Sequence, residues 1–228
     1  MHKKPAEQLS VNLGRASRTV YRIGLPGHIE QFQWFKFKAK ALKIPWMDPE
    51  KNLDLYIQAH ALNRLYERID CLFRTYLRVD ILVSFSQPRV IMQKGNTRLI
   101  ELRLDNKHKV GYFVAEVVDQ MVVIRTFLFL TQENTPEGEK LKELMDASRE
   151  DAKYWALDRL STFLESDISK NQRLKAKFIE AGCGSLFRLE LIPTGPAPET
   201  IRQADAMVKY FGLDEEEEKG APVRGCDG

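Results

Sequence analysis

The segment HALNRLYER, residues 60–68, combines residue types that suit proton transfer and anion binding. At 100° per residue on a helix, Arg64 lies about 40° from His60, Glu67 about 20° to the other side and Arg68 about 80° away. Histidine shuttles protons near neutral pH, and the arginine guanidinium matches the oxygens of a phosphate. The pattern therefore predicts one helix face that joins an acid–base group to phosphate-binding groups.

The same helix face also has a purely structural interpretation. Oppositely charged side chains three or four residues apart commonly pair on a solvated helix and contribute a few tenths of a kcal/mol each. Glu67 can pair with Arg64 in this way. Both interpretations stay open at the level of the sequence.

Arg125 is a second unusual charge, because its expected same-face neighbours in the strand at 121–130 are all apolar (Val123, Phe127 and Phe129). A charge in such a place needs a partner or a pocket. If residues 119–120 form a two-residue turn, Val114 lies opposite Arg125 and Glu116 is a diagonal neighbour within reach. We therefore expect a buried Glu116–Arg125 pair, with contact to a ligand as the alternative.

Four segments with strand-like alternation lie close together in the sequence: 89–93, 97–104, 110–118 and 121–130. Short turns between successive strands are typical of an antiparallel meander. The last two strands are apolar on both faces, so we expect them to be central and covered on both sides.

Helical periodicity comes before and after this meander. Apolar residues at helical spacing (Leu55, Leu62, Leu65, Tyr66, Ile69 and Phe73) predict a helix over 55–73, and a second helix is predicted over 72–83. Thr135 and Pro136 provide an N-cap and a first helical residue. They open a helix at 137–148, and helices at 150–166, 169–181 and 199–211 follow.

The remaining segments complete the predicted fold. A short strand is expected from residue 19, a longer strand over 30–42 and a late strand over 186–192. Residues 1–17 are expected to be loose, 193–198 to be a linker and 214–228 an acidic disordered tail. The fold class is α+β: a four-stranded antiparallel β-meander with helices packed on it, N-terminal strands and a C-terminal helical extension. One domain is expected over 18–192, with its core at 55–131 and a helical part at 136–182.

A helix carrying HALNRLYER, followed by a meander that ends in VIRTFLFLT at residues 123–131, resembles the BrnT/RelE-like ribonuclease toxins of the barnase–colicin–RelE group. The resemblance covers residues 55–131. It implies an RNA-binding or RNA-cleaving domain of toxin type, with RNA as the partner and no need for a metal.

Metal-free RNA cleavage requires a base, an acid and cations that stabilise the charge developing on phosphorus. Our hypothesis is that His60 is the acid–base group and that Arg64, Arg68 and Arg125 contact phosphate. Thr126 or Thr131 would orient the substrate, and Tyr112 would stack on a base or donate a proton. The predicted catalytic residues are thus His60, Arg64, Arg125 and Thr126. Arg68, Tyr112 and Thr131 are predicted to bind the substrate.

Lys36 and Lys38 are further candidates for substrate binding, because they alternate with aromatic residues in the strand at 32–37. The structural alternative places those aromatic residues in the core and the lysines at its rim.

Composition limits the class of protein. The chain has 228 residues, a net charge of +3 and three separated cysteines, so a reduced intracellular (cytoplasmic) protein is expected. Residues 1–47 carry nine Lys or Arg against two Glu, whereas residues 214–218 are all acidic. The most apolar stretch, 111–131, contains three charges, and we expect no membrane span.

Common cofactor and metal motifs are absent from the sequence, namely Walker A, GxGxxG, GxSxG, HExxH and paired CxxC. We therefore expect no cofactor. The alternative to a ribonuclease is a non-catalytic binding or regulatory protein, in which the N- and C-terminal elements form a homodimer surface or a surface for a protein partner.

Overall fold

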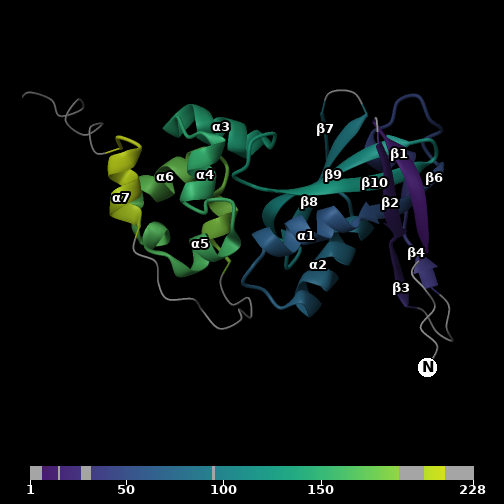
Figure 1. Ribbon diagram of the computed structural model, residues 1–228, viewed down its shortest axis with the longest axis horizontal. Helices are drawn as coiled ribbons and strands as arrows, with labels where there is room; N and C mark the ends of the chain where they lie inside the picture. The colour runs from purple at the N-terminus through teal and green to yellow at the C-terminus, as the bar shows by residue number, and fades with distance from the viewer. Residues whose placement is uncertain (1–6, 15, 27–31, 94–95, 190–202, 214–228) are drawn as a thin grey trace, which may run out of the picture.

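The structure is a computed structural model that describes residues 7–14, 16–26, 32–93, 96–189 and 203–213. A β-sheet forms one end of the molecule, and the C-terminal helices form the other (Figure 1). This arrangement confirms the α+β class.

Within the described residues, eight strands form one mixed sheet in the order β1-β2-β6-β10-β9-β8-β7, with β5 also paired to β6. The strands are β1 (Gln8–Leu13), β2 (Ala16–Arg22), β5 (Lys36–Lys38), β6 (Asn52–Gln58), β7 (Val90–Met92), β8 (Thr97–Leu104), β9 (His108–Val118) and β10 (Met121–Phe129). A separate two-stranded sheet pairs β3 (Gly24–Pro26) with β4 (Phe32–Trp34).

The predicted four-stranded antiparallel meander is only part of the sheet. Strands β7 to β10 follow one another in antiparallel pairs, as expected. The sheet nevertheless continues past β10, because β6 joins β10 in parallel register. A four-stranded antiparallel sheet is therefore the wrong description, and the sheet is mixed.

The error arises at β6, which the sequence pattern assigns to the start of a helix over 55–73. Residues 53, 55 and 57 face the main core with the period of two of a strand, while Tyr56 belongs to a small cluster on the other face. The run 55–57 is buried throughout, and Leu55 also fits the helical spacing of the residues that follow. The helix α1 begins only at Ala59 and ends at Arg68. It packs against β10, and α2 (Arg74–Ser86) packs against β8. Phe73, expected on the buried side, is half exposed.

A β-bulge in β10 gives Arg125 different neighbours from those that the sequence predicts. Ile124 pairs with Ala115 and Thr126 pairs with Val114, so Arg125 has no residue directly opposite. The extra residue changes which side chains face the main core: Val122 and Ile124 before the bulge, Phe127 and Phe129 after it. Arg125 is consequently turned toward solvent, with 46% of its side chain exposed.

The C-terminal helices are α3 (Pro136–Met145), α4 (Arg149–Tyr154), α5 (Leu160–Glu165), α6 (Gln172–Glu180) and α7 (Ala204–Tyr210), with the short 3-10 turns η2 (Asp167–Lys170) and η3 (Gly184–Phe187) among them. A third such turn, η1 (Ala39–Leu42), follows β5. The helix predicted over 150–166 is two helices, because the chain turns at Ala156, whose φ is 49°.

Three other predictions differ from the structure. The late strand predicted at 186–192 is wrong where it is described, because residues 186–187 end the turn η3 and residues 188–189 belong to no helix or strand; its last three residues lie outside the described residues. Residues 8–13 form β1 rather than a loose terminus. The segment at 30–42 divides into β4, β5 and η1. The predicted linker at 193–198 and the tail at 214–228 lie outside the described residues.

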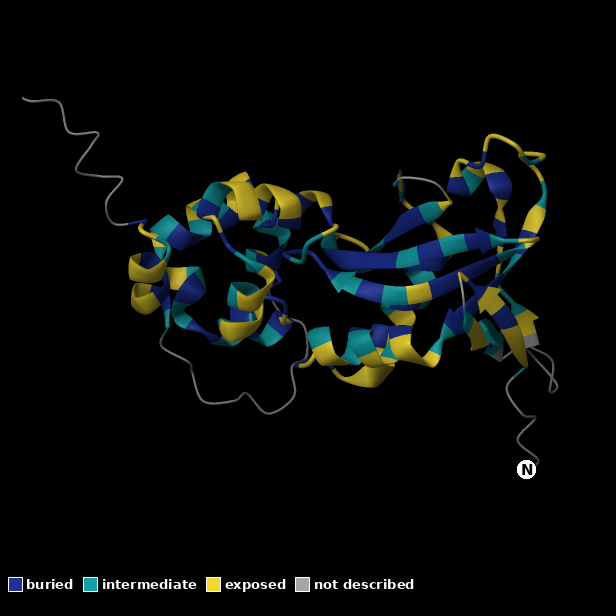
Figure 2. Ribbon diagram, turned by 45° about the horizontal axis from the view of Figure 1, so that its top comes forward, coloured by how far each residue is buried: buried dark blue, intermediate teal, exposed yellow. Residues whose placement is uncertain are grey.

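The main core lies between the sheet and the helices. Buried residues run along the central strands, and exposed residues lie on the outer faces of the helices (Figure 2). A chain of ring contacts joins Phe37, Phe85, Phe113 and Phe127, with centroids 5.0–5.9 Å apart. The central positions of β9 and β10 confirm what their apolar sequences predict.

Candidate functional site

His60, Arg64 and Glu67 lie on the solvent side of α1. His60 and Glu67 are exposed, and Arg64 donates to Glu67 Oε2 at 2.8 Å, with about half of each of these two side chains exposed. The structural interpretation of this stripe is thus present as an i,i+3 ion pair, which contributes a few tenths of a kcal/mol.

Arg68 leaves that stripe and turns into the helical half of the molecule. Its guanidinium forms an ion pair with Asp158, and only 12% of the Arg68 side chain and 4% of the Asp158 side chain are exposed. Burial lowers the pKa of Arg68, and the Asp158 carboxylate opposes that shift. Arg68 Nε is buried without a hydrogen-bond partner among the described residues.

Arg125 forms the expected pair with Glu116, at 2.7 Å from Nη1 to Oε2. The pair is confirmed, but its expected burial is wrong, because the bulge exposes the arginine. Thr126 follows the bulge and is half-buried.

Tyr112 and Thr131 have structural contacts in the interior. Tyr112 is fully buried and its hydroxyl lies 3.0 Å from both carboxylate oxygens of Glu137, which also binds Lys109. Burial, with the Glu137 charge as the second cause, raises the pKa of Tyr112. The ring of Tyr112 therefore has no free face for a base. Thr131 donates to the backbone oxygen of Leu157 at 2.6 Å.

Lys36 and Lys38 are exposed residues of β5 and are paired with acids. Lys36 is 3.6 Å from Asp54, and Lys38 is 2.6 Å from Glu50. Lys38 is opposite Asn52 at the start of β6, whereas α1 begins beyond the end of that strand. At about 3.3 Å per residue, β6 separates these lysines from α1 by about 20 Å.

A partly open cavity of about 130 Å³ lies where the C-terminal end of α1, the end of β10, α3 and α4 meet. We call it the Arg68 cavity. Of the predicted site residues, it brings together only Arg68 and Thr131; His60, Arg64, Tyr112, Arg125, Thr126 and the two lysines do not line it.

The Arg68 cavity carries more positive than negative charge. Its two carboxylates are both paired, Asp158 with Arg68 and Glu133 with Lys142 at 3.0 Å. Two further cations line the cavity, Arg149 and Lys153. Neither has a hydrogen-bond or ion-pair partner among the described residues. The side-chain amides of Gln132 and Asn134 add neutral donors to the wall.

Local sequence explains how the walls of the cavity are held. Ser148 and Asp151 form a capping box, with hydrogen bonds of 3.2 and 2.8 Å, that starts α4 just before Arg149. Thr135 caps α3 by accepting from Gly138 N at 2.9 Å. A Cβ at Gly138 would lie 1.9 Å from the backbone oxygen of Gln132, so this close approach requires glycine.

Arg149, Lys153 and Asp158 line the cavity but are not among the predicted site residues, and the sequence holds a signal for the first two only. Arg149 and Lys153 are four residues apart and therefore share one helix face. Asp158 has no comparable signal, because it meets Arg68 only through a contact between residues 90 positions apart.

Metal and thiol chemistry find little support in the described part of the chain. It contains no group of three or more His, Cys, Asp or Glu side chains that could hold a metal ion. Burial raises the pKa values of Cys71 and Cys183 to about 12. Neither cysteine has the lowered pKa of a reactive thiol.

No family model, curated protein or solved structure matches this chain. The resemblance to ribonuclease toxins therefore stays a prediction. Among the described helices, none has the length and apolar character needed to span a membrane.

Proposed function

We propose that this chain is a non-catalytic binding protein whose ligand presents a small anionic group to the Arg68 cavity. One observation carries the proposal: both carboxylates of the cavity are already paired, while the exposed cations Arg149 and Lys153 have no partner among the described residues. An anion would replace solvent as the acceptor for these two cations.

The volume of the cavity limits the size of the group that can enter it. At about 30 Å³ per water, 130 Å³ corresponds to roughly four waters. That space suits a phosphate or carboxylate group, with the rest of the ligand outside. Phosphate is favoured because it carries up to two negative charges, matching the two unpaired cations.

The ion pairs favour binding over RNA cleavage. Arg64 and Arg125 would each have to give up a carboxylate partner to contact a phosphate. His60 lies exposed, and His60, Arg64 and Arg125 all lie outside the Arg68 cavity. The ribonuclease hypothesis remains a prediction that one arm of the following experiment tests.

Calorimetric titration at constant ionic strength tests the anion site, with inorganic phosphate, a phosphate monoester and malonate as probes. Two charge-assisted hydrogen bonds of about 1.5 kcal/mol each amount to roughly 100-fold in Kd. We expect that loss in the double variant Arg149→Gln/Lys153→Gln. The matched control, Arg78→Gln/Lys140→Gln, removes two exposed cations outside the cavity and should bind as the wild type does.

Absence of binding for all three probes, or equal losses in both double variants, would refute the anion site. Binding of malonate without binding of phosphate would show that the anionic group of the ligand is a carboxylate. In the second arm, RNA is incubated with protein in EDTA. RNA cleavage that is lost in His60→Ala would overturn the non-catalytic proposal and support the ribonuclease hypothesis.

A further inference from the structure

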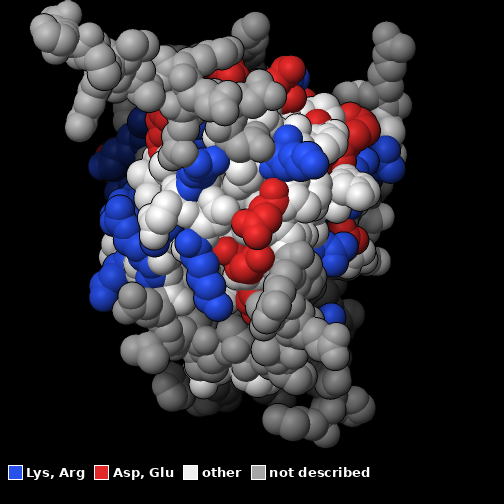
Figure 3. All heavy atoms as spheres, turned by 90° about the vertical axis from the view of Figure 1, so that its left-hand side faces the viewer, with Lys and Arg blue, Asp and Glu red and all other residues white. Residues whose placement is uncertain are grey.

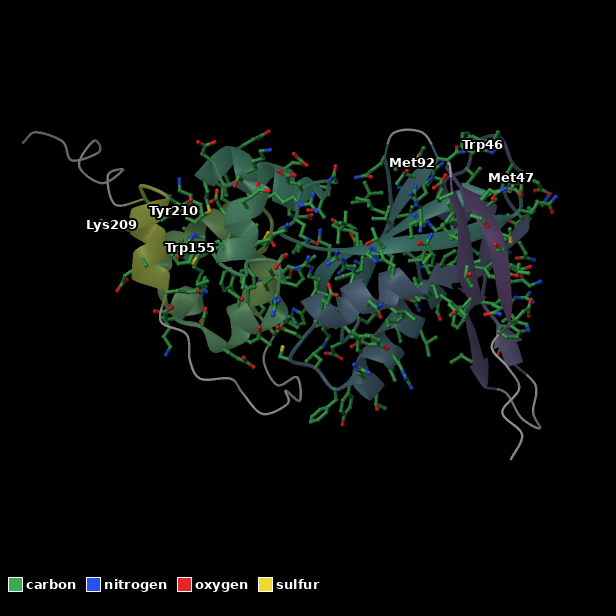
Figure 4. The ribbon with its side chains drawn as sticks, viewed as in Figure 1. Trp46, Met47, Met92, Trp155, Lys209 and Tyr210 are labelled. Carbon is green, nitrogen blue, oxygen red and sulfur yellow. The ribbon has the colours of Figure 1, made fainter. Side chains whose placement is uncertain are left out.

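An exposed aromatic groove lies at the helical end of the molecule, apart from the Arg68 cavity. We call it the α4–α7 groove; its lining residues include Glu150, Tyr154, Trp155, Lys209 and Tyr210. Figure 4 shows Trp155, Lys209 and Tyr210 close together at this end. The groove has a volume of about 640 Å³ and is open to solvent.

Three aromatic rings form the floor and sides of the groove. The Trp155 ring is 5.0 Å from that of Tyr154 and 5.7 Å from that of Tyr210, measured between centroids. The Tyr210 hydroxyl donates to Asp151 Oδ1 at 2.6 Å, which fixes α7 against α4. Tyr210, and Trp155 that packs against it, are therefore held in place before binding, which lowers the cost of ordering them.

Much of this aromatic surface is in contact with water. Tyr154 is 78% exposed and Tyr210 is 57% exposed. With about 200 Å² per aromatic side chain, the two tyrosines expose roughly 270 Å². A standard interface buries about 800 Å² on each partner, so these rings would supply about a third of one as its apolar centre.

The charges at the groove identify its occupant. Glu150 lies on α4 and Lys209 on α7, and neither has an ion-pair partner among the described residues. Acidic and basic side chains lie near one another on this end of the molecule (Figure 3). The third charge of the lining, Asp151, accepts hydrogen bonds from Tyr210 and Ser148. The surface therefore offers one charge of each sign that has no hydrogen-bond or ion-pair partner among the described residues, and it is complementary to itself.

We propose that the α4–α7 groove is a homodimer interface in which two copies of this chain pack about a two-fold axis. Contacts between different residues occur twice in such an interface. Glu150 of each copy pairs with Lys209 of the other, and the tyrosines pack at the centre. The inference is independent of the anion site, because Arg149 and Lys153 line a different surface.

Sedimentation equilibrium over a range of concentrations tests the interface. The wild type should approach twice the chain mass of 26.4 kDa. Glu150→Lys and Lys209→Glu each place like charges opposite one another twice, and each should weaken dimerisation at least about tenfold. The charge-reversed double variant Glu150→Lys/Lys209→Glu should restore it.

Tyr154→Glu should also give monomers, whereas Tyr76→Glu is the matched control. Tyr76 is 53% exposed but lies on α2, away from the groove. A wild type that remains at 26.4 kDa would overturn the proposal, as would a dimer that none of the groove variants weakens. A double variant no better than the single ones would equally refute the Glu150–Lys209 pairing. Circular dichroism of each variant separates loss of dimer from loss of fold.

Discussion

Replacement of Arg68 by methionine should destabilise the protein strongly, whereas the same change at Arg64 should not. Both arginines lie on α1, and each pairs with one carboxylate. Met keeps the apolar length of the side chain and removes the charge. The variants differ mainly in burial: 12% of the Arg68 side chain is exposed against 42% for Arg64.

Burial determines the size of the effect. Without Arg68, the Asp158 carboxylate, 4% exposed, loses its one hydrogen-bond partner among the described residues. Leaving a buried charge uncompensated costs about 3–5 kcal/mol. An exposed i,i+3 pair contributes only about 0.3–0.5 kcal/mol. In a domain of this size these values correspond to losses in Tm of about 6–20 °C and about 1–2 °C.

Urea unfolding at pH 7 measures both variants against the wild type. The double variant Arg68→Met/Asp158→Asn should recover part of the lost stability, because the unpaired charge is then gone. If Arg68→Met cost no more than Arg64→Met, the interior pair would not be holding α1 to the helical half, and the reasoning from burial would fail. An additive double variant would show that the two residues do not interact.

Three other predictions concern the interior. Tyr112→Phe should cost about 1–3 kcal/mol in urea unfolding, since it removes the hydroxyl from both oxygens of buried Glu137; no change would mean that Lys109 alone satisfies that carboxylate. Gly138→Ala should cost at least about 2 kcal/mol by thermal unfolding, because its Cβ would lie 1.9 Å from a backbone oxygen, and a fully stable variant would contradict that contact. Cys71 and Cys183, with pKa values of about 12, should react with a thiol reagent at pH 9 roughly a thousandfold more slowly in native than in urea-unfolded protein, as measured in a Cys226→Ser background. Because burial raises these pKa values, the stability linked to the two thiols is present below pH 9 and declines as pH rises toward 12; rapid labelling of the native protein would refute their burial.

Local signals predicted the elements that local chemistry determines. Thr135 caps the start of α3, and Pro136 has the fixed φ of a first helical residue. Both effects act within one turn, so the sequence alone shows them. Strands β8 to β10 were predictable from alternation and short turns. Strand β6 was not, because leucine at 55, 62 and 65 fits a helical period even though the first of these lies in a strand.

The candidate site was less predictable than the fold, since its residues meet only in three dimensions. Arg68 was singled out by its spacing from His60, yet its partner is Asp158 in another part of the chain. The Glu116–Arg125 pair was predictable from strand pairing, but the bulge that exposes it shifts the register by one residue. The shift changes the phase of the alternation, but β10 is apolar on both faces, so its sequence does not reveal the change.

The parallel pairing of β6 with β10 has a consequence for the folding rate. Ile57 and Ile124 are register partners although more than sixty residues separate them. Closing so long a loop costs chain entropy before any contact compensates for it, and non-local pairing slows folding. Strands β2 and β5 both pair with β6. During synthesis, the N-terminal part of the sheet must therefore wait for β10 to leave the ribosome before it can join the rest.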